Sequence, residues 1–160
     1  MRVSFIPPSE DGLLGVRFEV TGAPPCVNAA LPTDKSQWGL WEWDVVELFL
    51  ATNASANYYE FQLSPAGQFF ELEIFEPRKR FNKDFVSGFE HSVERVAPDA
   101  WTAEFRIPLR KLGWDGKLES VRGNAFAILG ASGAKSYWSL NLPAQLKPDF
   151  HLPQFFKAVF

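Results

Sequence analysis

The sequence has few of the residues that build metal centres and disulfides. Its 160 residues include one cysteine, Cys26, and two histidines, His91 and His151. A single cysteine excludes an internal disulfide and cannot anchor a zinc site, so we interpret Cys26 as a small buried hydrophobic residue. Two histidines are too few for a histidine-rich metal site. We therefore expect neither a metal nor a cofactor.

A basic surplus and long apolar runs are also absent. The formal net charge is −3 and the pI is about 5.4, whereas nucleic acids and anionic membrane surfaces bind basic patches. No stretch approaches the ~20 apolar residues that a membrane span requires. The first residues, MRVSFIPPSEDG, contain no apolar run, so we expect no signal peptide and a cytoplasmic location. Nucleic acids and membranes are not expected partners.

Aromatic residues are abundant, at 16% of the chain, with 16 Phe and 6 Trp. Many lie in segments where apolar and polar residues alternate, the pattern of a half-buried β-strand. Strands are predicted in this way over residues 14–20, 46–50, 59–63, 70–74 and 101–107, with further strands near 124–129, 136–140 and 155–160.

The only convincing helix candidate is one turn over residues 108–113, closed by Gly113. Many short strands separated by Gly, Pro and Asn predict an all-β fold, an antiparallel β-sandwich of jelly-roll or immunoglobulin-like type with at most one short helix. We expect a single domain over residues 1–160, a length at which roughly 70% of the unfolded surface can be buried. The irregular stretches 22–39 and 141–153 are long enough to suggest a functional role.

Side-chain alternation divides the strand residues into two faces. The core face is predicted to hold Val46, Leu48 and Leu50, followed by Tyr59, Phe61, Leu63, Phe70, Leu72 and Ile74. The opposite face would then hold Trp41, Trp43, Val45, Glu47, Phe49, Tyr58, Glu60, Gln62, Phe69, Glu71, Glu73 and Phe75. Flat rings stack on the C–H faces of sugars, and carboxylates and amides bond their hydroxyls. The alternatives are a second layer of core or an ordinary soluble face.

Five segments of the chain follow one another in the order seen in DOMON-like proteins related to family 9 carbohydrate-binding modules. They are LWEWDVVELFL, YYEFQLSPAGQ, AWTAEFRIPLRKLG, SYWSL and KPDFHLP. The chain resembles a bacterial-type subgroup of these proteins over most of its length. The resemblance implies that two rings clamp a terminal sugar while a glutamate and an arginine hold its hydroxyls. On this basis Trp41 and Phe150 are the expected clamping rings and Glu47 is the expected glutamate.

The arginine of the resemblance is replaced by Gln62. Either its amide provides a weaker hydrogen bond, or Arg78 or Arg80 supplies the guanidinium, which would also suit an acidic sugar such as a uronate. His151 beside the second ring is either a ligand contact or a loop-ordering residue, and Trp138 in SYWSL is a further candidate ring. The acidic N-terminal calcium segment of those modules has no clear counterpart here, and haem held by methionine and histidine is disfavoured because the only methionine is the first residue.

These observations predict a non-catalytic domain that binds a small sugar or a glycan terminus. One alternative is a protein-interaction or dimerisation sandwich that buries Trp41 and Trp43 against a partner or a second copy. The other is a weak glycoside hydrolase, because Glu47 and Glu60 on neighbouring strands could lie about 5–10 Å apart across a sugar. The sequence contains no G-x-S-x-G motif, P-loop or Cys-His pairing, so we expect no enzyme.

Overall fold

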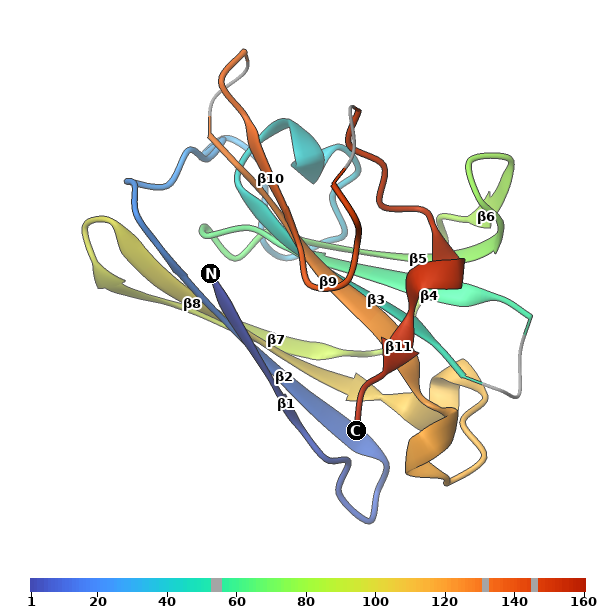
Figure 1. Ribbon diagram of the computed structural model, residues 1–160. Coiled ribbons are helices and arrows are strands. Elements are labelled where there is room, and N and C mark those ends of the chain that lie inside the picture. The colour runs from blue at the N-terminus through green and yellow to red at the C-terminus, as the bar shows by residue number, and fades with distance from the viewer. Residues whose placement is uncertain (53–55, 131–132, 145–146) are drawn as a thin grey trace.

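The computed structural model describes residues 1–52, 56–130, 133–144 and 147–160, which form two antiparallel β-sheets (Figure 1). Sheet A contains, in spatial order, β1 (Arg2–Ile6), β2 (Leu13–Thr21), β8 (Ala100–Pro108) and β7 (Glu90–Ala97). Sheet B contains, in spatial order, β10 (Ser136–Ser139), β9 (Arg122–Leu129), β3 (Val45–Ala51), β4 (Tyr58–Leu63), β5 (Phe69–Glu76) and β6 (Arg80–Asn82), and β11 (Lys157–Ala158) also pairs with β9. The predicted all-β antiparallel sandwich is confirmed.

Helical structure is limited to short 3₁₀ turns. The predicted turn after Pro108 is confirmed as η2 (Leu109–Leu112), and Gly113 closes it with a left-handed φ of 76°. Three further turns were not predicted: η1 (Leu40–Glu42), η3 (Leu118–Ser120) and η4 (Pro153–Phe155). No helix within the described residues has seven or more residues, and none is long and apolar enough to cross a membrane.

An inner core fills the space between the two sheets. Val46, Leu48 and Leu50 of β3 are fully buried there, as the alternation along that strand predicted. They pack with β2 and β8, whose inward residues include Phe18 and Trp101. Both sheets thus bury an alternating apolar face against each other, which is the usual source of stability in a sandwich.

A second core covers the opposite face of sheet B. Its buried residues are Leu40, Val45, Phe49, Tyr58, Phe70, Leu72, Ile74, Phe126, Ile128 and Phe156, which we call the outer cluster. Leu40 and Phe156 reach it from segments outside the sheet, and Leu31, Trp41, Leu142 and Phe150 pack partly buried against it. The alternative of a second core layer is therefore correct for part of this face.

The predicted faces of β5 are wrong. In the register of β4 and β5, Gln62 lies opposite Phe70 and Glu60 lies opposite Leu72, and opposite residues in an antiparallel pair point to the same side. Phe70, Leu72 and Ile74 therefore face the outer side, while Phe69 packs on the inner core. Alternation shows which residues share a face but not which side of the sheet that face takes, and both sides of sheet B carry a core.

Candidate functional site

A cavity of about 730 Å³ opens on the outer face of sheet B beside the outer cluster. Its floor is formed by Glu47 of β3, Glu60 and Gln62 of β4, and Leu72 and Ile74 of β5. These side chains share one face because Glu47 pairs with Gln62 and Glu60 pairs with Leu72 across the sheet. The three polar ones are almost fully buried, with 3%, 4% and 1% exposure for Glu47, Glu60 and Gln62.

One amide links the two carboxyl groups of the floor. Gln62 Nε2 donates to Glu47 Oε1 at 3.1 Å and to Glu60 Oε1 at 2.5 Å. Both amide hydrogens are therefore used within the floor. Among the described residues, Gln62 Oε1 finds no hydrogen-bond partner although it is buried. A buried acceptor without a partner lowers the stability of the fold, and a hydrogen-bond donor of a ligand can satisfy it.

The two floor carboxyls hold protons at higher pH than exposed ones do. Burial raises the pKa of Glu47 well above its ordinary value, and the neighbouring charge of Glu60 raises it further. Burial also raises the pKa of Glu60 to about 7, against the opposing effect of its hydrogen bond with Gln62. Close to neutral pH the pair therefore keeps at least one proton, which belongs to the pair and not to either residue.

A histidine and a tyrosine border the acidic pair. The Tyr58 hydroxyl and His151 Nδ1 are 2.9 Å apart, and His151 Nε2 lies 3.9 Å from Glu60 Oε2. Burial lowers the pKa of His151 to about 4, helped by the charge of Arg78 and opposed by Asp149. The imidazole is therefore neutral at neutral pH and does not compensate the carboxyl pair.

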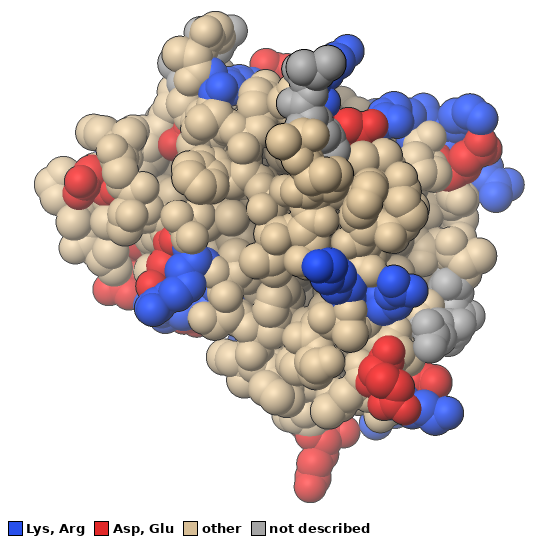
Figure 2. All heavy atoms as spheres, viewed as in Figure 1, with Lys and Arg blue, Asp and Glu red and all other residues tan. Residues whose placement is uncertain are grey.

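The loop of His151 is tied to the β5–β6 turn. Asp149 accepts a hydrogen bond from the His151 amide at 3.1 Å and forms an ion pair with Arg78. Arg78 has a φ of 62°, a left-handed backbone that non-glycine residues rarely adopt. Figure 2 shows Lys and Arg side chains gathered at this side of the molecule with acidic side chains among them. In the hairpin, Lys79 forms an ion pair with Glu76. The cationic run of the hairpin is therefore partly neutralised.

Aromatic rings form the walls. Trp38 meets Trp41 edge to face at a centroid distance of 4.7 Å and lies nearly parallel to Phe81 at 6.0 Å. On the other wall, Phe150 stacks on Phe126 at 4.3 Å with an interplanar angle of 14°. Trp38 is 49% exposed, so it presents a large apolar area beside a polar floor, as in many sites for small ligands.

Most of the predicted site residues line this one cavity: Trp41, Glu47, Glu60, Gln62, Arg78, Phe150 and His151. Three others do not. Trp43 lies in the segment between η1 and β3, where strand alternation does not apply. Arg80 lies over the Phe75 ring at 5.2 Å, and Trp138 lines a neighbouring cavity of about 290 Å³.

Several cavity residues were missed by the sequence analysis. Trp38 and Phe81 contribute rings, and Tyr137 lines the cavity where Trp138 was the expected ring. Lys135 also lines the cavity, and its ammonium donates a hydrogen bond to the Trp41 carbonyl oxygen at 2.7 Å. One signal was available for Trp38, because it lies near the end of the irregular stretch 22–39. Within the described residues, no group of three or more His, Cys, Asp or Glu side chains could hold a metal ion.

No family model matches the chain. Its sequence relatives include vertebrate proteins named UPF0462 protein C4orf33 or its homolog. The Danio rerio protein is 28% identical over 161 residues, covering 94% of this chain and 75% of the relative. The Rattus norvegicus protein is 30% identical over 125 residues, or 74% of this chain and 59% of the relative. The human protein is 29% identical over 126 residues, again 74% and 59%.

Two solved structures share the fold. A Bacteroides uniformis protein assigned to carbohydrate binding has a TM-score of 0.69 at 17% identity, covering 91% of this chain and 71% of that one. A family 9 carbohydrate-binding module from Caldicellulosiruptor kristjanssonii, in complex with cellotriose, has a TM-score of 0.53 at 16% identity, covering 84% and 62%. The chain thus has the sandwich fold of carbohydrate-binding modules. The expected DOMON-like and bacterial character is not among these findings, since the named sequence relatives are vertebrate proteins.

The expectation of a cytoplasmic location is contradicted by the same comparisons. Carbohydrate-binding modules and carbohydrate-binding proteins, the classes of the two structural neighbours, are typically extracellular or secreted. The expectation depended on the first residues lacking an apolar run, and that observation says nothing about where the protein works. On the fold comparison, the chain is similar to carbohydrate-binding sandwiches.

Proposed function

We propose that the chain, as a single domain, binds a carbohydrate without chemical conversion in the cavity on the outer face of sheet B. The observation that carries this proposal is the meeting of Glu47, Glu60 and Gln62, all nearly fully buried, with exposed aromatic area in one hollow of about 730 Å³. Ligand sites are typically concave, about 300–1,000 Å³ in volume, and mostly apolar with a few convergent polar groups. The fold of two carbohydrate-binding neighbours supports the same class of ligand.

The aromatic residues of the cavity provide contact area, and its polar residues orient the ligand. Trp38, Trp41 and Phe150 offer rings to the C–H faces of a sugar. The floor carboxyls and the Oε1 of Gln62 accept hydrogen bonds from its hydroxyls. With one stacked unit and a few bonds of about 1 kcal/mol each, we expect a Kd on the order of micromolar to millimolar.

Calorimetry with cellotriose and a glycan array tests the proposal, with two tryptophan variants as a matched pair. Trp38 and Trp138 are both 49% exposed, but only Trp38 lines the cavity. We expect Trp38→Ala to weaken binding about 5- to 10-fold, because one ring contact contributes about 1 kcal/mol. Trp138→Ala should leave the affinity unchanged. Equal losses in both variants, or no glycan bound by the wild type, would overturn the proposal.

A glycoside hydrolase is the second candidate, and one observation favours it. Glu47 and Glu60 accept hydrogen bonds from the same nitrogen atom, at 3.1 and 2.5 Å. Their two accepting oxygens are therefore at most the sum of these distances apart, which is compatible with the ~5–5.5 Å between the carboxyl groups of retaining glycosidases. The raised pKa of Glu60, about 7, would suit a general acid. Release of reducing sugar that Glu47→Gln abolishes would support catalysis, and a flat trace over a glycan panel would exclude it.

A dimerisation surface is the third candidate. Tyr137, Trp138 and Leu140, on and just after β10, are 46–50% exposed, and β10 is an edge strand of sheet B. Edge strands with apolar side chains readily pair with another chain. Light scattering over a range of concentrations would reveal a dimer, and Trp138→Ala should weaken it. A monomer at every concentration would exclude this role.

A further inference from the structure

When its two carboxyls are ionised, the floor of the cavity offers hydrogen-bond acceptors and almost no donors. The amide hydrogens of Gln62 are both given to Glu47 and Glu60, and the Oε1 of the same amide has no partner among the described residues. Gln62 is 1% exposed, so solvent reaches it poorly. A ligand group that only donates would satisfy this floor better than a hydroxyl, which both donates and accepts.

No cation of the protein balances the two floor carboxyls. Arg78 is paired with Asp149, and Lys135 binds the Trp41 carbonyl and approaches Glu42 at 3.4 Å. Within the part of the chain that the structure describes, the acidic pair forms no ion pair with a Lys or Arg side chain. The one basic group close to it is His151, which is neutral at neutral pH. A buried acidic pair without a counter-charge attracts a cation from outside.

We infer that the sugar bound here carries a protonated amino group, as an unacetylated glucosamine unit does, and that this group sits on Glu47, Glu60 and Gln62. An ammonium has three donors and no acceptor, which matches the floor. The Lys83 ammonium already lies 3.4 Å from the centroid of the Trp38 ring, which shows that this aromatic wall attracts cations through its π faces. This inference rests on the proposed carbohydrate binding and narrows it to one class of sugar.

Ligand binding should then release protons. In the free protein the acidic pair keeps at least one proton near neutral pH, and an ammonium beside it favours the ionised form. Affinity for the amino sugar should therefore rise as the pH increases from about 5 toward 7 while the amine of the ligand keeps its own proton, and it should fall again above the pKa of that amine. The other titratable or charged groups around the cavity are Glu42, Tyr58, Arg78, Lys83, Lys135, Tyr137, Asp149 and His151. Of these, His151 carries a pKa of about 4 and gains its proton only below this window.

Three trimers with the same β-1,4 backbone test the inference by calorimetry at low salt. Cellotriose has a hydroxyl at C2, chitotriose an acetamide, and its fully deacetylated counterpart an amine. We expect the deacetylated trimer to bind at least about 10-fold more tightly than cellotriose at pH 7, with a measured enthalpy that depends on the ionisation enthalpy of the buffer. At pH 5 the preference should fall to less than about 3-fold.

Matched variants separate the acidic pair from the general negative charge of the protein. Glu60→Gln and, independently, Glu47→Gln should reduce the amine preference, measured as the ratio of the two dissociation constants, at least 5-fold, and each should also weaken the binding of cellotriose, whose hydroxyls lose a carboxylate acceptor. Glu94→Gln, on exposed sheet A, makes the same charge change away from the cavity and should keep the preference. A preference that survives both floor variants would overturn the inference.

The outcomes separate this inference from the function on which it rests. Cellotriose binding without an amine preference would overturn the inference and leave carbohydrate binding standing. Failure of all three trimers would count against both. Tighter binding of a trimer of uronic acids would also overturn the inference, because it would make the guanidinium of Arg78 the recognising group.

Discussion

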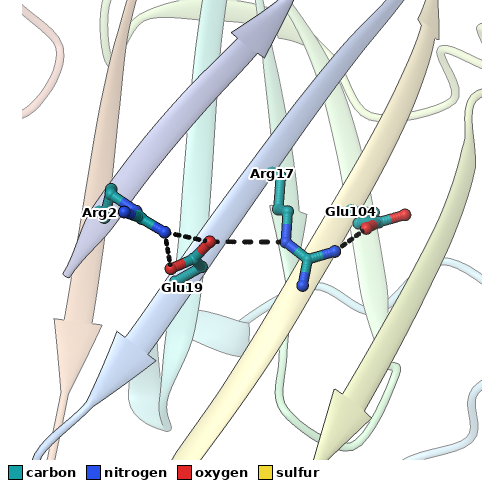
Figure 3. A network of polar contacts seen from close by, with 4 residues as sticks. All are labelled: Arg2, Arg17, Glu19 and Glu104. Atoms are coloured by element: carbon teal, nitrogen blue, oxygen red, sulfur yellow. Dashed lines mark hydrogen bonds and ion pairs between the residues drawn. The ribbon is translucent and has the colours of Figure 1, made fainter. Parts of the chain in front are cut away.

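Glutamates lie on the outer faces of both sheets, but they are partly exposed on sheet A and buried on sheet B. On sheet A, Arg2 donates two hydrogen bonds to Glu19, at 2.9 and 2.7 Å, and Arg17 lies between Glu19 and Glu104 (Figure 3). These side chains are solvent-exposed to a third or more. On sheet B, Glu47 and Glu60 of the outer face are buried and form no ion pair with a Lys or Arg side chain among the described residues. Glutamate is a solvated ion on one face and a buried, proton-holding acid on the other.

The difference comes from what covers each face. None of the described segments forms a second layer over the outer face of sheet A, so its outward charges stay in water, where ion pairs contribute little. The C-terminal segment and the residues before β3 lie over sheet B, and Leu40 and Phe156 bury part of it (Figure 1). The part that they leave open becomes the cavity. The segments that cover the outer face of sheet B therefore form both the outer cluster and the candidate binding cavity.

The largest effect should come from breaking the second core. Phe49 is fully buried and contacts Phe126, Tyr58 and Phe156 on the outer side of sheet B. We expect Phe49→Ala to lower the free energy of unfolding by about 3–5 kcal/mol, as for other buried aromatic residues. Phe81→Ala, whose ring is 37% exposed, is the control and should cost much less. Urea denaturation measures both, and similar losses would contradict the idea of a second core.

A smaller effect should appear in the pH dependence of stability. Burial raises the pKa of Glu60 from about 4.5 to about 7, so between these values the folded state holds a proton that the unfolded state has released. Stability therefore falls as the pH rises through this window. Glu60→Gln removes the effect, and the variant should gain stability relative to the wild type between pH 5 and pH 8, by roughly 1–3 kcal/mol. The contribution of His151, which has the opposite slope, is common to both proteins.

Glu19→Gln on sheet A provides the contrasting case. The hydrogen bond from Arg2 holds the pKa of Glu19 below its ordinary value, so its contribution to stability is present above about pH 4.5 and is lost as the pH falls through the folded-state pKa. The difference between wild type and variant should shrink in acid. Urea midpoints from pH 3 to 8 measure both series, and slopes of the same sign would contradict the contrast between the faces.

The fold was predictable mainly from β2 and β8 of sheet A, because their outward faces carry polar residues between the buried apolar ones. Alternation along β2, β3 and β8 identified the inward residues correctly, and the glycine after Leu112 marked one of the four 3₁₀ turns that the described residues form. The sides of β5 were not predictable, because its buried apolar residues pack in the outer cluster, while Glu71 on the inner side is buried and accepts hydrogen bonds from Ser87. The strand β1 was also missed.

The site was predictable where residues share a strand face, and less so where loops bring them together. Glu47, Glu60 and Gln62 follow from alternation on β3 and β4, and they do share the floor. Trp38 comes from an irregular segment and Tyr137 from a strand whose orientation the pattern left open. The protonation of the floor also could not be predicted, since it depends on burial that long-range packing alone creates.

The smallest effect should come from the exposed ion pairs of sheet A. Arg17 forms an ion pair with Glu104 across β2 and β8, and their side chains are 39% and 45% exposed. Such pairs typically contribute about 0.2–1 kcal/mol, because water screens the charges and both side chains lose rotamer freedom. A double-mutant cycle with Arg17→Ala and Glu104→Ala should therefore give a coupling energy below about 1 kcal/mol that decreases further in 1 M salt. A coupling energy of several kcal/mol that is insensitive to salt would mean that sheet A is covered in solution, and the contrast between the two outer faces would then fail.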